Sequence, residues 1–391
     1  MSSYLSASWV YPVSSPPLQN GIIEVNEKGT ILNVWTAAQG KALDITDVRY
    51  YQGVLVPGLV NTHCHLELSH LAGKIAEHTG LPGFVQQIMQ QRQASEIEIE
   101  NAMQLADAAM HANGIVATGD ISNQSGSKRV KLNSPVYYHT FVEVMGFNPE
   151  RAAEIITKAK ETRDAFLPLK ATIVPHAPYS VSTELFKEIN QTSGTADDIV
   201  SVHNQETEAE NLFFEEKKGH FLKLYEFLGL DISFFRAEGK TSLQSYLPLL
   251  ARQASTLLVH NTFTSRADIE FAKSTHPKLF WCLCPNANLY IENKLPDVEM
   301  LRDSGVTITL GTDSLASNHK LSILAEMRTL QMHANITFDE LLCWATLNGA
   351  TFLGMETQLG TLEKGKTPGI NLIQQLENGH ITPDTHIQRI I

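Results

Sequence analysis

The chain has 391 residues, of which 43% are hydrophobic and 18% are charged, a composition typical of a globular protein rather than a disordered one. Its 42 acidic and 30 basic side chains give a formal net charge of -12. Because the sequence contains no cluster of lysine and arginine, we expect no nucleic-acid partner.

The N-terminal residues and the cysteines indicate in which cellular compartment the protein is expected. Residues 1–10 lack the basic and apolar regions of a secretion signal, and no later apolar stretch reaches the length of about 18 residues that spans a membrane. The few cysteines do not form the framework of a disulfide-rich protein, so we expect reduced thiols. They are Cys64, Cys282, Cys284 and Cys343. We therefore expect a soluble, cytoplasmic protein without membrane association.

Both ends of the chain carry short strand patterns. Residues 20–36 alternate apolar and polar side chains around the turn sequence 26–29, which predicts a β-hairpin. Near the other end, the glycine-containing segment 365–369 precedes an apolar run at 370–373, which predicts another short strand. Neither end has a pattern of helical length.

The middle of the chain alternates short apolar runs with longer amphipathic segments such as 101–113 and 149–166, which predicts repeated βα units. The apolar runs end near His63, Asp120, Glu143, His176, His203, His260, Cys284 and Asp313. Eight strands in about 250 residues predict a (β/α)8 barrel, in which catalytic groups lie at the C-terminal ends of the strands. Residues 81–85, in the long first connection, are expected to form a lid or a pocket wall.

His63 and His65 directly follow the apolar run 54–60. Alternate residues of a strand point to the same face, so both imidazoles would enter one space while Cys64 points away. Two neutral imidazoles on one face are a typical beginning of a zinc or iron site. The alternative is a pair of unrelated surface or core histidines.

His203 follows the β-branched run 199–202, and Glu206 follows three residues later. A strand that ends at His203 would add a third imidazole, with Glu206 rising beside it from the next loop. Glu206 is either a catalytic carboxyl or an acidic residue at a helix N-terminus, the role that we expect for Glu208 and Glu210.

Asp313 ends the apolar segment 309–312 and could complete a site of three histidines and one aspartate, in which its carboxylate would also accept a proton from water. The alternative role is an N-cap for the next helix, which Ser314 could fill instead.

Two further histidines end predicted strands. His260 is either a hydrogen-bonded core residue or a group that orients the nucleophile and stabilises the addition intermediate. His176 stands between two prolines and beside Tyr179, a polar and aromatic setting suited to substrate contact, with a purely structural role as the alternative.

Taken together, these motifs resemble the amidohydrolase superfamily, and within it the branch of metal-dependent deaminases and chlorohydrolases. The resemblance rests on residues 57–67, 176–179, 203–206, His260 and 311–314, in the order typical of the superfamily. Residues 63–69 and 141–147 are similar to segments of aminodeoxyfutalosine and other adenosine-type deaminases.

The resemblance implies a barrel of residues 57–357 and a small β-sandwich domain built from residues 1–56 and 358–391. It implies one divalent metal ion, with zinc expected first and iron or manganese as alternatives. The implied ligands are His63, His65, His203 and Asp313. Glu206 would pass a proton to a ring nitrogen and on to the leaving ammonia, while His260 and Asp313 handle the attacking water. One ion is expected rather than two, because His176 stands where binuclear relatives carry a bridging lysine or glutamate.

The predicted activity is hydrolytic deamination of a purine-like or nucleoside substrate by a hydroxide generated at one metal ion. Aminodeoxyfutalosine or another adenosine derivative is the expected substrate, bound through Glu67, Glu143 and His176, and the resemblance also suggests a homodimer. The alternatives are a guanine or pterin deaminase, a hydrolytic dechlorinase or a cyclic amide hydrolase. A non-catalytic barrel is disfavoured, because the complete set of six metal-binding and catalytic residues is present.

Overall fold

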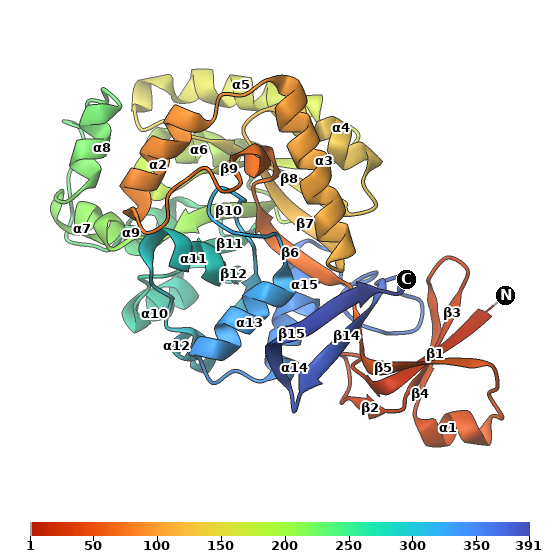
Figure 1. Ribbon diagram of the computed structural model, residues 1–391. Coiled ribbons are helices and arrows are strands. Elements are labelled where there is room, and N and C mark those ends of the chain that lie inside the picture. Colours follow the sequence, from red (N-terminus) through yellow and green to blue (C-terminus); the bar gives the residue numbers. More distant parts are fainter. Residues whose placement is uncertain (1) are drawn as a thin grey trace.

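The structure is a computed structural model that describes residues 2–391. Segments from the two chain ends form one mixed sheet of seven strands. Its members are β1 (Ser2–Val10), β2 (Leu18–Gln19), β3 (Ile22–Asn26), β4 (Ile31–Trp35), β5 (Val48–Pro57), β14 (Ile370–Glu377) and β15 (His380–Arg389). The predicted hairpin is confirmed, since β3 and β4 pair in antiparallel register, and β14 begins where the C-terminal strand was expected. Figure 1 shows β14 and β15 beside the strands from the N-terminal end.

Eight further strands form two parallel sheets of four. The first contains β6 (Leu59–Cys64), β7 (Ile115–Ser122), β8 (Tyr137–Val144) and β9 (Lys170–Pro175). The second contains β10 (Ile199–Asn204), β11 (Ser255–His260), β12 (Leu279–Leu283) and β13 (Thr307–Leu310). All eight end close to the positions expected from the sequence. The predicted α/β class with parallel strands is therefore confirmed.

The two parallel sheets meet at both pairs of edge strands. Beyond β9, the carbonyl of His176 accepts a hydrogen bond from the backbone N–H of His203 on β10, at 2.9 Å. At the opposite edge, Cys64 on β6 and Asp313 form an isolated parallel bridge. These contacts bring the carboxyl ends of β6, β10 and β13 into one region.

Helices connect the strands and cover them from outside (Figure 1). The α-helices are α1 (Ala37–Ala42), α2 (Gly80–Gln91), α3 (Glu96–Ala112), α4 (Lys128–Asn133), α5 (Ala152–Ala165), α6 (Thr183–Ser193), α7 (Glu208–Glu216), α8 (Phe221–Phe227), α9 (Ser242–Tyr246), α10 (Arg266–Thr275), α11 (Pro285–Glu292), α12 (Val298–Asp303), α13 (Ile323–His333), α14 (Phe338–Ala345) and α15 (Leu347–Phe352). Short 3-10 helices are η1 (Leu66–Leu71), η2 (Ser125–Ser127), η3 (Pro149–Arg151), η4 (Pro178–Ser180) and η5 (Leu247–Leu249). The amphipathic segments predicted at 101–113 and 149–166 lie largely in α3 and α5.

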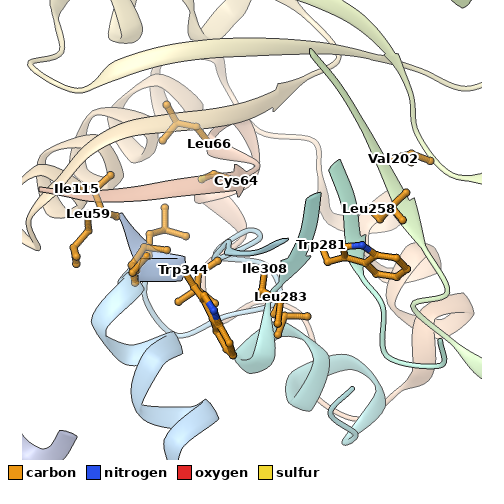
Figure 2. Close-up of a cluster of buried hydrophobic side chains, with 14 of the residues drawn as sticks. Leu59, Cys64, Leu66, Ile115, Val202, Leu258, Trp281, Leu283, Ile308 and Trp344 are labelled. Carbon is orange, nitrogen blue, oxygen red and sulfur yellow. The ribbon is translucent and has the colours of Figure 1, made fainter. Parts of the chain in front are cut away.

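The parallel strands are buried on both faces, as their nearly continuous apolar sequences require. The largest apolar cluster joins strand residues such as Leu59, Val202 and Ile308 to helical residues such as Trp344 (Figure 2). Cys64 lies in this cluster and is fully buried. Its neighbours His63 and His65 are therefore free to point elsewhere, as the alternation along a strand predicts.

Within residues 2–391, no helix is both long and apolar enough to cross a membrane. The four cysteines are all free thiols in the structure.

Candidate metal and catalytic site

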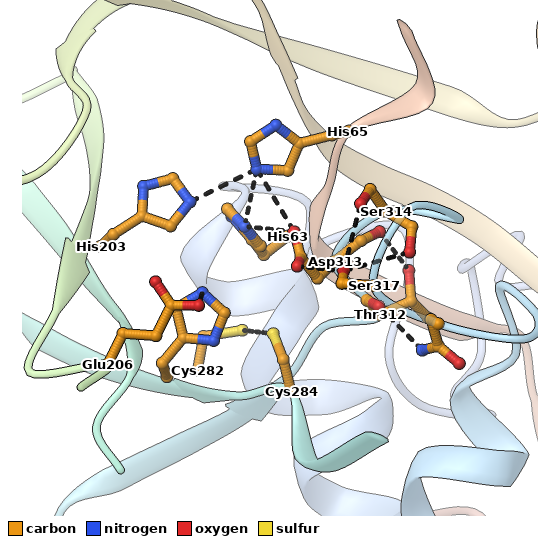
Figure 3. Close-up of polar contacts among 12 residues, drawn as sticks. His63, His65, His203, Glu206, Cys282, Cys284, Thr312, Asp313, Ser314 and Ser317 are labelled. Carbon is orange, nitrogen blue, oxygen red and sulfur yellow. Dashed lines mark hydrogen bonds and ion pairs between the residues drawn. The ribbon is translucent and has the colours of Figure 1, made fainter. Parts of the chain in front are cut away.

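Four of the predicted site residues converge at the carboxyl ends of β6, β10 and β13 (Figure 3). His65 Nε2 lies 3.2 Å from His63 Nε2 and 3.3 Å from His203 Nε2. Asp313 Oδ1 lies 3.6 Å from His63 Nε2 and 3.4 Å from His65 Nε2. All four side chains are buried or nearly so. The structure thus brings together the complete set of residues that the sequence predicted as metal ligands.

The backbone around Asp313 explains why its carboxylate reaches the histidines. Asp313 has a left-handed φ of 54°, an uncommon conformation for a residue with a side chain. It is held there because the carbonyl of His63 accepts hydrogen bonds from the N–H groups of Thr312 and Asp313, at 3.0 and 3.1 Å. The turn after β13 is therefore tied directly to the histidines at the end of β6.

Gly311 makes this close approach between β6, β12 and β13 feasible. A Cβ atom at this position would lie 2.8 Å from both Cys282 Sγ and His63 Cβ, and 3.0 Å from Cys284 Sγ. Real Cβ atoms almost never approach other atoms so closely, so any larger residue would push His63 or a neighbouring strand aside. The glycine before Thr312 and Asp313 is thus required by packing next to the site.

Burial lowers the pKa of all three imidazoles, and for His65 the value falls to about 4. The histidines are therefore neutral near pH 7, which is the form that binds metal ions. His203 Nδ1 donates a hydrogen bond to the His176 carbonyl at 2.8 Å, so the lone pair of its Nε2 faces His65. Although burial favours a protonated Asp313, the neighbouring His63, His65 and His260 hold the pKa of its carboxyl well below the usual range.

The donor set fits a divalent metal ion. His65 Nε2 lies within hydrogen-bond distance of both His63 Nε2 and His203 Nε2, and the Nδ1–H tautomer of His203 leaves a lone pair on its Nε2, as a metal ligand requires. Asp313 Oδ1 faces the same region, while its Oδ2 accepts a hydrogen bond from Ser317 Oγ. Three imidazoles and one carboxylate are ligands that zinc prefers.

Glu206 and His260 form a second pair beside this cluster. Glu206 Oε1 lies 3.6 Å from His260 Nε2, and both side chains are buried. Burial, together with the charges of Asp313 and Glu210, raises the pKa of Glu206 well above its usual value, which favours the protonated carboxyl. His260 Nδ1 donates a hydrogen bond to Asn288 Oδ1 at 2.8 Å, which leaves Nε2 as the acceptor facing Glu206.

The helix-terminal role weighed for Glu206 falls to other residues. Helix α7 begins at Glu208, and Glu208 and Glu210 occupy its first turn as expected. The Glu210 carboxylate accepts hydrogen bonds from the backbone N–H groups of Gln205 and Glu206, at 3.0 and 3.3 Å. The N-cap expected at Asp313 or Ser314 is at neither residue, because the next α-helix, α13, is capped by Ser322. Ser314 Oγ instead accepts from the N–H of Ala316 within the turn after β13.

The predicted substrate residues lie next to the cluster and are connected to one another. The N–H of Asn123 donates to Glu67 Oε2 at 3.1 Å, and its side-chain amide donates to Glu143 Oε2 at 3.3 Å. Burial raises the pKa of Glu67 to about 7 and that of Glu143 to about 8. Glu143 Oε1 is buried without a hydrogen-bond partner, 3.5 Å from His203 Nδ1. Ligand atoms of Glu143, His176 and His203 lie within 4.8 Å of one another.

Sequence reasoning missed three polar residues that support the site. Asn288 fixes the His260 tautomer, Ser317 donates a hydrogen bond to Asp313, and Asn123 joins Glu67 to Glu143. Asn288 stands in the short motif after β12, whose position after a strand end was a usable signal. Ser317 and Asn123 carry no such signal, because isolated serine and asparagine residues are common in any loop.

A family model described as the amidohydrolase family matches residues 54–389. The chain belongs to this family. It is 27% identical over 330 residues to a Helicobacter pylori adenosine deaminase, with 83% of this chain and 79% of that protein covered. It is 26% identical over 352 residues to a Nitratiruptor aminodeoxyfutalosine deaminase, with 86% and 83% covered. The crystal structure of Helicobacter pylori aminofutalosine deaminase in complex with methylthio-coformycin is similar, with a TM-score of 0.81, 25% identity, and 97% and 93% of the two chains covered.

These similarities confirm the predictions of the superfamily and of a metal-dependent hydrolase that acts on carbon–nitrogen bonds as a deaminase. A divalent metal ion is supported by the family together with the cluster of histidines and aspartate. The identity of the ion stays a prediction.

Proposed function

We propose that this amidohydrolase deaminates an adenosine-like nucleoside by hydrolysis, with aminodeoxyfutalosine and other 5′-substituted adenosines as the first candidates. The observation that carries the proposal is the position of the buried Glu206, 3.6 Å from His260 and next to the cluster of histidines and Asp313 (Figure 3), in surroundings that favour its protonated form. Deamination of a heteroaromatic ring needs this combination of a proton donor and an activated water. The names of the relatives support the adenosine-like class.

His63, His65, His203 and Asp313 are the proposed ligands of one divalent ion, with zinc as the first choice because it favours imidazole and carboxylate donors. When bound, such an ion lowers the pKa of a water molecule and supplies hydroxide near neutral pH. Two other donor groups, His63 with His203 and His260, and Glu143 with His176 and His203, share His203 with the proposed site. His203 has only its Nε2 free as a ligand, because its Nδ1 donates to the His176 carbonyl, which favours one ion over two.

The side chains around this position have distinct roles in the proposed reaction. Glu206 donates its proton to a ring nitrogen next to the amino-bearing carbon, which makes that carbon accept the nucleophile. His260 orients the attacking water through Nε2, and Asp313 accepts a proton from it. Glu206 then takes the proton of the added hydroxyl group as the C=O bond forms and relays it to the amino group, which leaves as ammonia. The proton that Asp313 took from water returns to Glu206, so both carboxyl groups regain their starting states.

Glu67, Glu143 and His176 are the proposed contacts to the substrate. The unpartnered Glu143 Oε1 offers an acceptor that a ribose hydroxyl or the edge of a base can satisfy. Asn123 holds Glu67 and Glu143 in fixed relation, so both would contact the same part of the substrate.

The architecture proposed with this activity is a closed (β/α)8 barrel of residues 57–357. Its support is the pair of edge contacts that join the two four-stranded sheets at His176 with His203 and at Cys64 with Asp313. The strands of the two chain ends would form a small β-sandwich domain of residues 1–56 and 358–391. A homodimer remains part of the proposal on family resemblance alone.

Ammonia release from a panel of compounds tests the activity. The panel contains adenosine, 5′-methylthioadenosine, aminodeoxyfutalosine, guanine and a pterin, and chloride release from a chlorinated triazine is measured in parallel. We expect turnover of the 5′-substituted adenosines by the zinc-loaded protein. Ammonia release only from guanine or the pterin, or chloride release alone, would overturn the proposed substrate class.

A further inference from the structure

A buried ion pair lies near the end of β7, the strand whose Asp120 was expected among the functional strand ends. Lys131 Nζ lies 2.6 Å from Asp120 Oδ2, and both side chains are fully buried. The ammonium also donates to Ser122 Oγ at 3.1 Å and Thr140 Oγ1 at 3.0 Å. Removing two charges from water is costly, and an apolar pair of similar volume would often be as stable. The buried ion pair of Lys131 and Asp120 therefore indicates a role other than packing.

The second oxygen of Asp120 contacts the chain next to the proposed metal site. Asp120 Oδ1 accepts a hydrogen bond of 2.8 Å from the backbone N–H of Leu66, the residue directly after His65. Asp120 is also the parallel partner of Cys64, the residue directly before His65. Leu66 begins η1, where the first N–H groups have no acceptor within the helix. A carboxylate acceptor there makes a strong, charge-assisted hydrogen bond.

We propose that Asp120, oriented by Lys131, is a positioning residue for His65. The inference rests on the proposed metal site, because its consequence is the placement of one ligand. His65 Nε2 lies within 3.2–3.4 Å of His63, His203 and Asp313, so a small shift of the following peptide would separate it from three other donors at once. Asp120 itself belongs to none of the metal-binding groups found among residues 2–391.

A comparison of two double variants separates positioning from packing. Lys131→Met with Asp120→Asn removes both charges but keeps an oxygen that can accept from Leu66 N–H. Lys131→Met with Asp120→Leu removes both charges and the acceptor, in a side chain of similar size. The rate of zinc release to a chelator and the visible spectrum of the cobalt-substituted protein report on the metal site, and thermal unfolding reports on the fold.

We expect the double variant with leucine to release zinc about 10–100-fold faster than the native protein, the usual effect of losing a partner behind a metal ligand. Its cobalt spectrum should shift, and kcat should fall more than KM rises. The double variant with asparagine should release zinc within about threefold of the native rate. Equal release rates in the two variants would overturn the proposal.

Two single variants complete the test: Asp107→Asn shows whether altering any buried carboxylate speeds zinc release, and Lys131→Met shows what Lys131 contributes. Asp107→Asn alters another buried carboxylate, which accepts hydrogen bonds from Ser134 and Tyr138, and it should leave zinc release unchanged. Lys131→Met alone keeps the Asp120 acceptor without its cation, and we expect an intermediate release rate. Native-like release from that variant would overturn the role of Lys131. A native protein that binds no zinc would overturn the metal site itself, whereas a zinc-binding protein without deaminase activity would count only against the proposed reaction.

Discussion

Replacement of Glu206 by glutamine tests the proposed proton donor most directly. The side chain is 5% exposed, and its Oε1 lies 3.6 Å from His260 Nε2. Glutamine keeps the shape of the side chain but has no carboxyl proton to deliver to a ring nitrogen. Because a positioned general acid contributes about 10²–10⁴-fold to a rate, we expect kcat to fall about 10³-fold, or about 4 kcal/mol of transition-state stabilisation.

The measurement is ammonia release at saturating substrate together with elemental analysis of the purified variant. Metal content should equal that of the native protein, because Glu206 belongs to none of the metal-binding groups of residues 2–391. Glu208→Gln is the matched control: it lies two residues away in the first turn of α7, is exposed, and should leave kcat unchanged. Loss of the metal in Glu206→Gln, or turnover within about threefold of native, would refute the assignment of Glu206 as a proton donor that is not a ligand.

The remaining predictions concern packing, pH and the metal. Gly311→Ala should lower the free energy of unfolding in urea by about 1–3 kcal/mol and lower the zinc content, because its Cβ would lie 2.8 Å from Cys282 and His63. Gly126→Ala is the control and should leave both unchanged, because no atom lies within 4 Å of the added Cβ. Burial raises the pKa of Glu326 from 4.5 to about 8, so its contribution to stability is present below pH 4.5 and is lost as pH rises to 8. Glu326→Gln should therefore flatten the decline of the unfolding free energy between these pH values. An unchanged slope would contradict the raised pKa of Glu326. Chelation should abolish turnover and lower the thermal midpoint, with both restored by added zinc; activity that survives complete metal removal would contradict the proposed metal dependence.

The sequence predicts the strand ends well because buried parallel strands are continuous apolar runs that stop where polar residues begin. His260 is the last residue of β11, and His203 is the last but one of β10. Asp313 lies beyond the end of β13, in a left-handed turn that the apolar pattern does not reveal. Its distance to the histidines depends on hydrogen bonds to the carbonyl of His63, which only the folded chain supplies.

The hydrogen-bond partners of the site residues are harder to predict, because each joins segments far apart in sequence. Asn288 and His260 come from different βα units, and so do Asp120 and Leu66. The apolar pattern places Asp120 near a strand end, two residues before the last residue of β7, but cannot tell whether its carboxylate faces the metal site or the strand beside it. Residues 81–85 illustrate the same limit, since they form the start of α2, and their expected role as a lid or pocket wall stays a prediction.

In the proposed mechanism, Glu206 acts as the acid and Asp313 as the base, because their surroundings shift the pKa values of the two carboxyl groups in opposite directions. Burial raises the pKa of Glu206, and the negative charges of Asp313 and Glu210 add to that effect. Asp313 is buried too, but the histidines around it lower its pKa overall. A pair of carboxyl groups driven apart in this way supplies an acid and a base at the same pH. The charge on Asp313 also favours the protonated form of Glu206, because it raises the pKa of that carboxyl. Replacement of Asp313 by asparagine would therefore remove a proposed ligand and also lower the pKa of Glu206, so that fewer molecules would carry the proton that the mechanism needs.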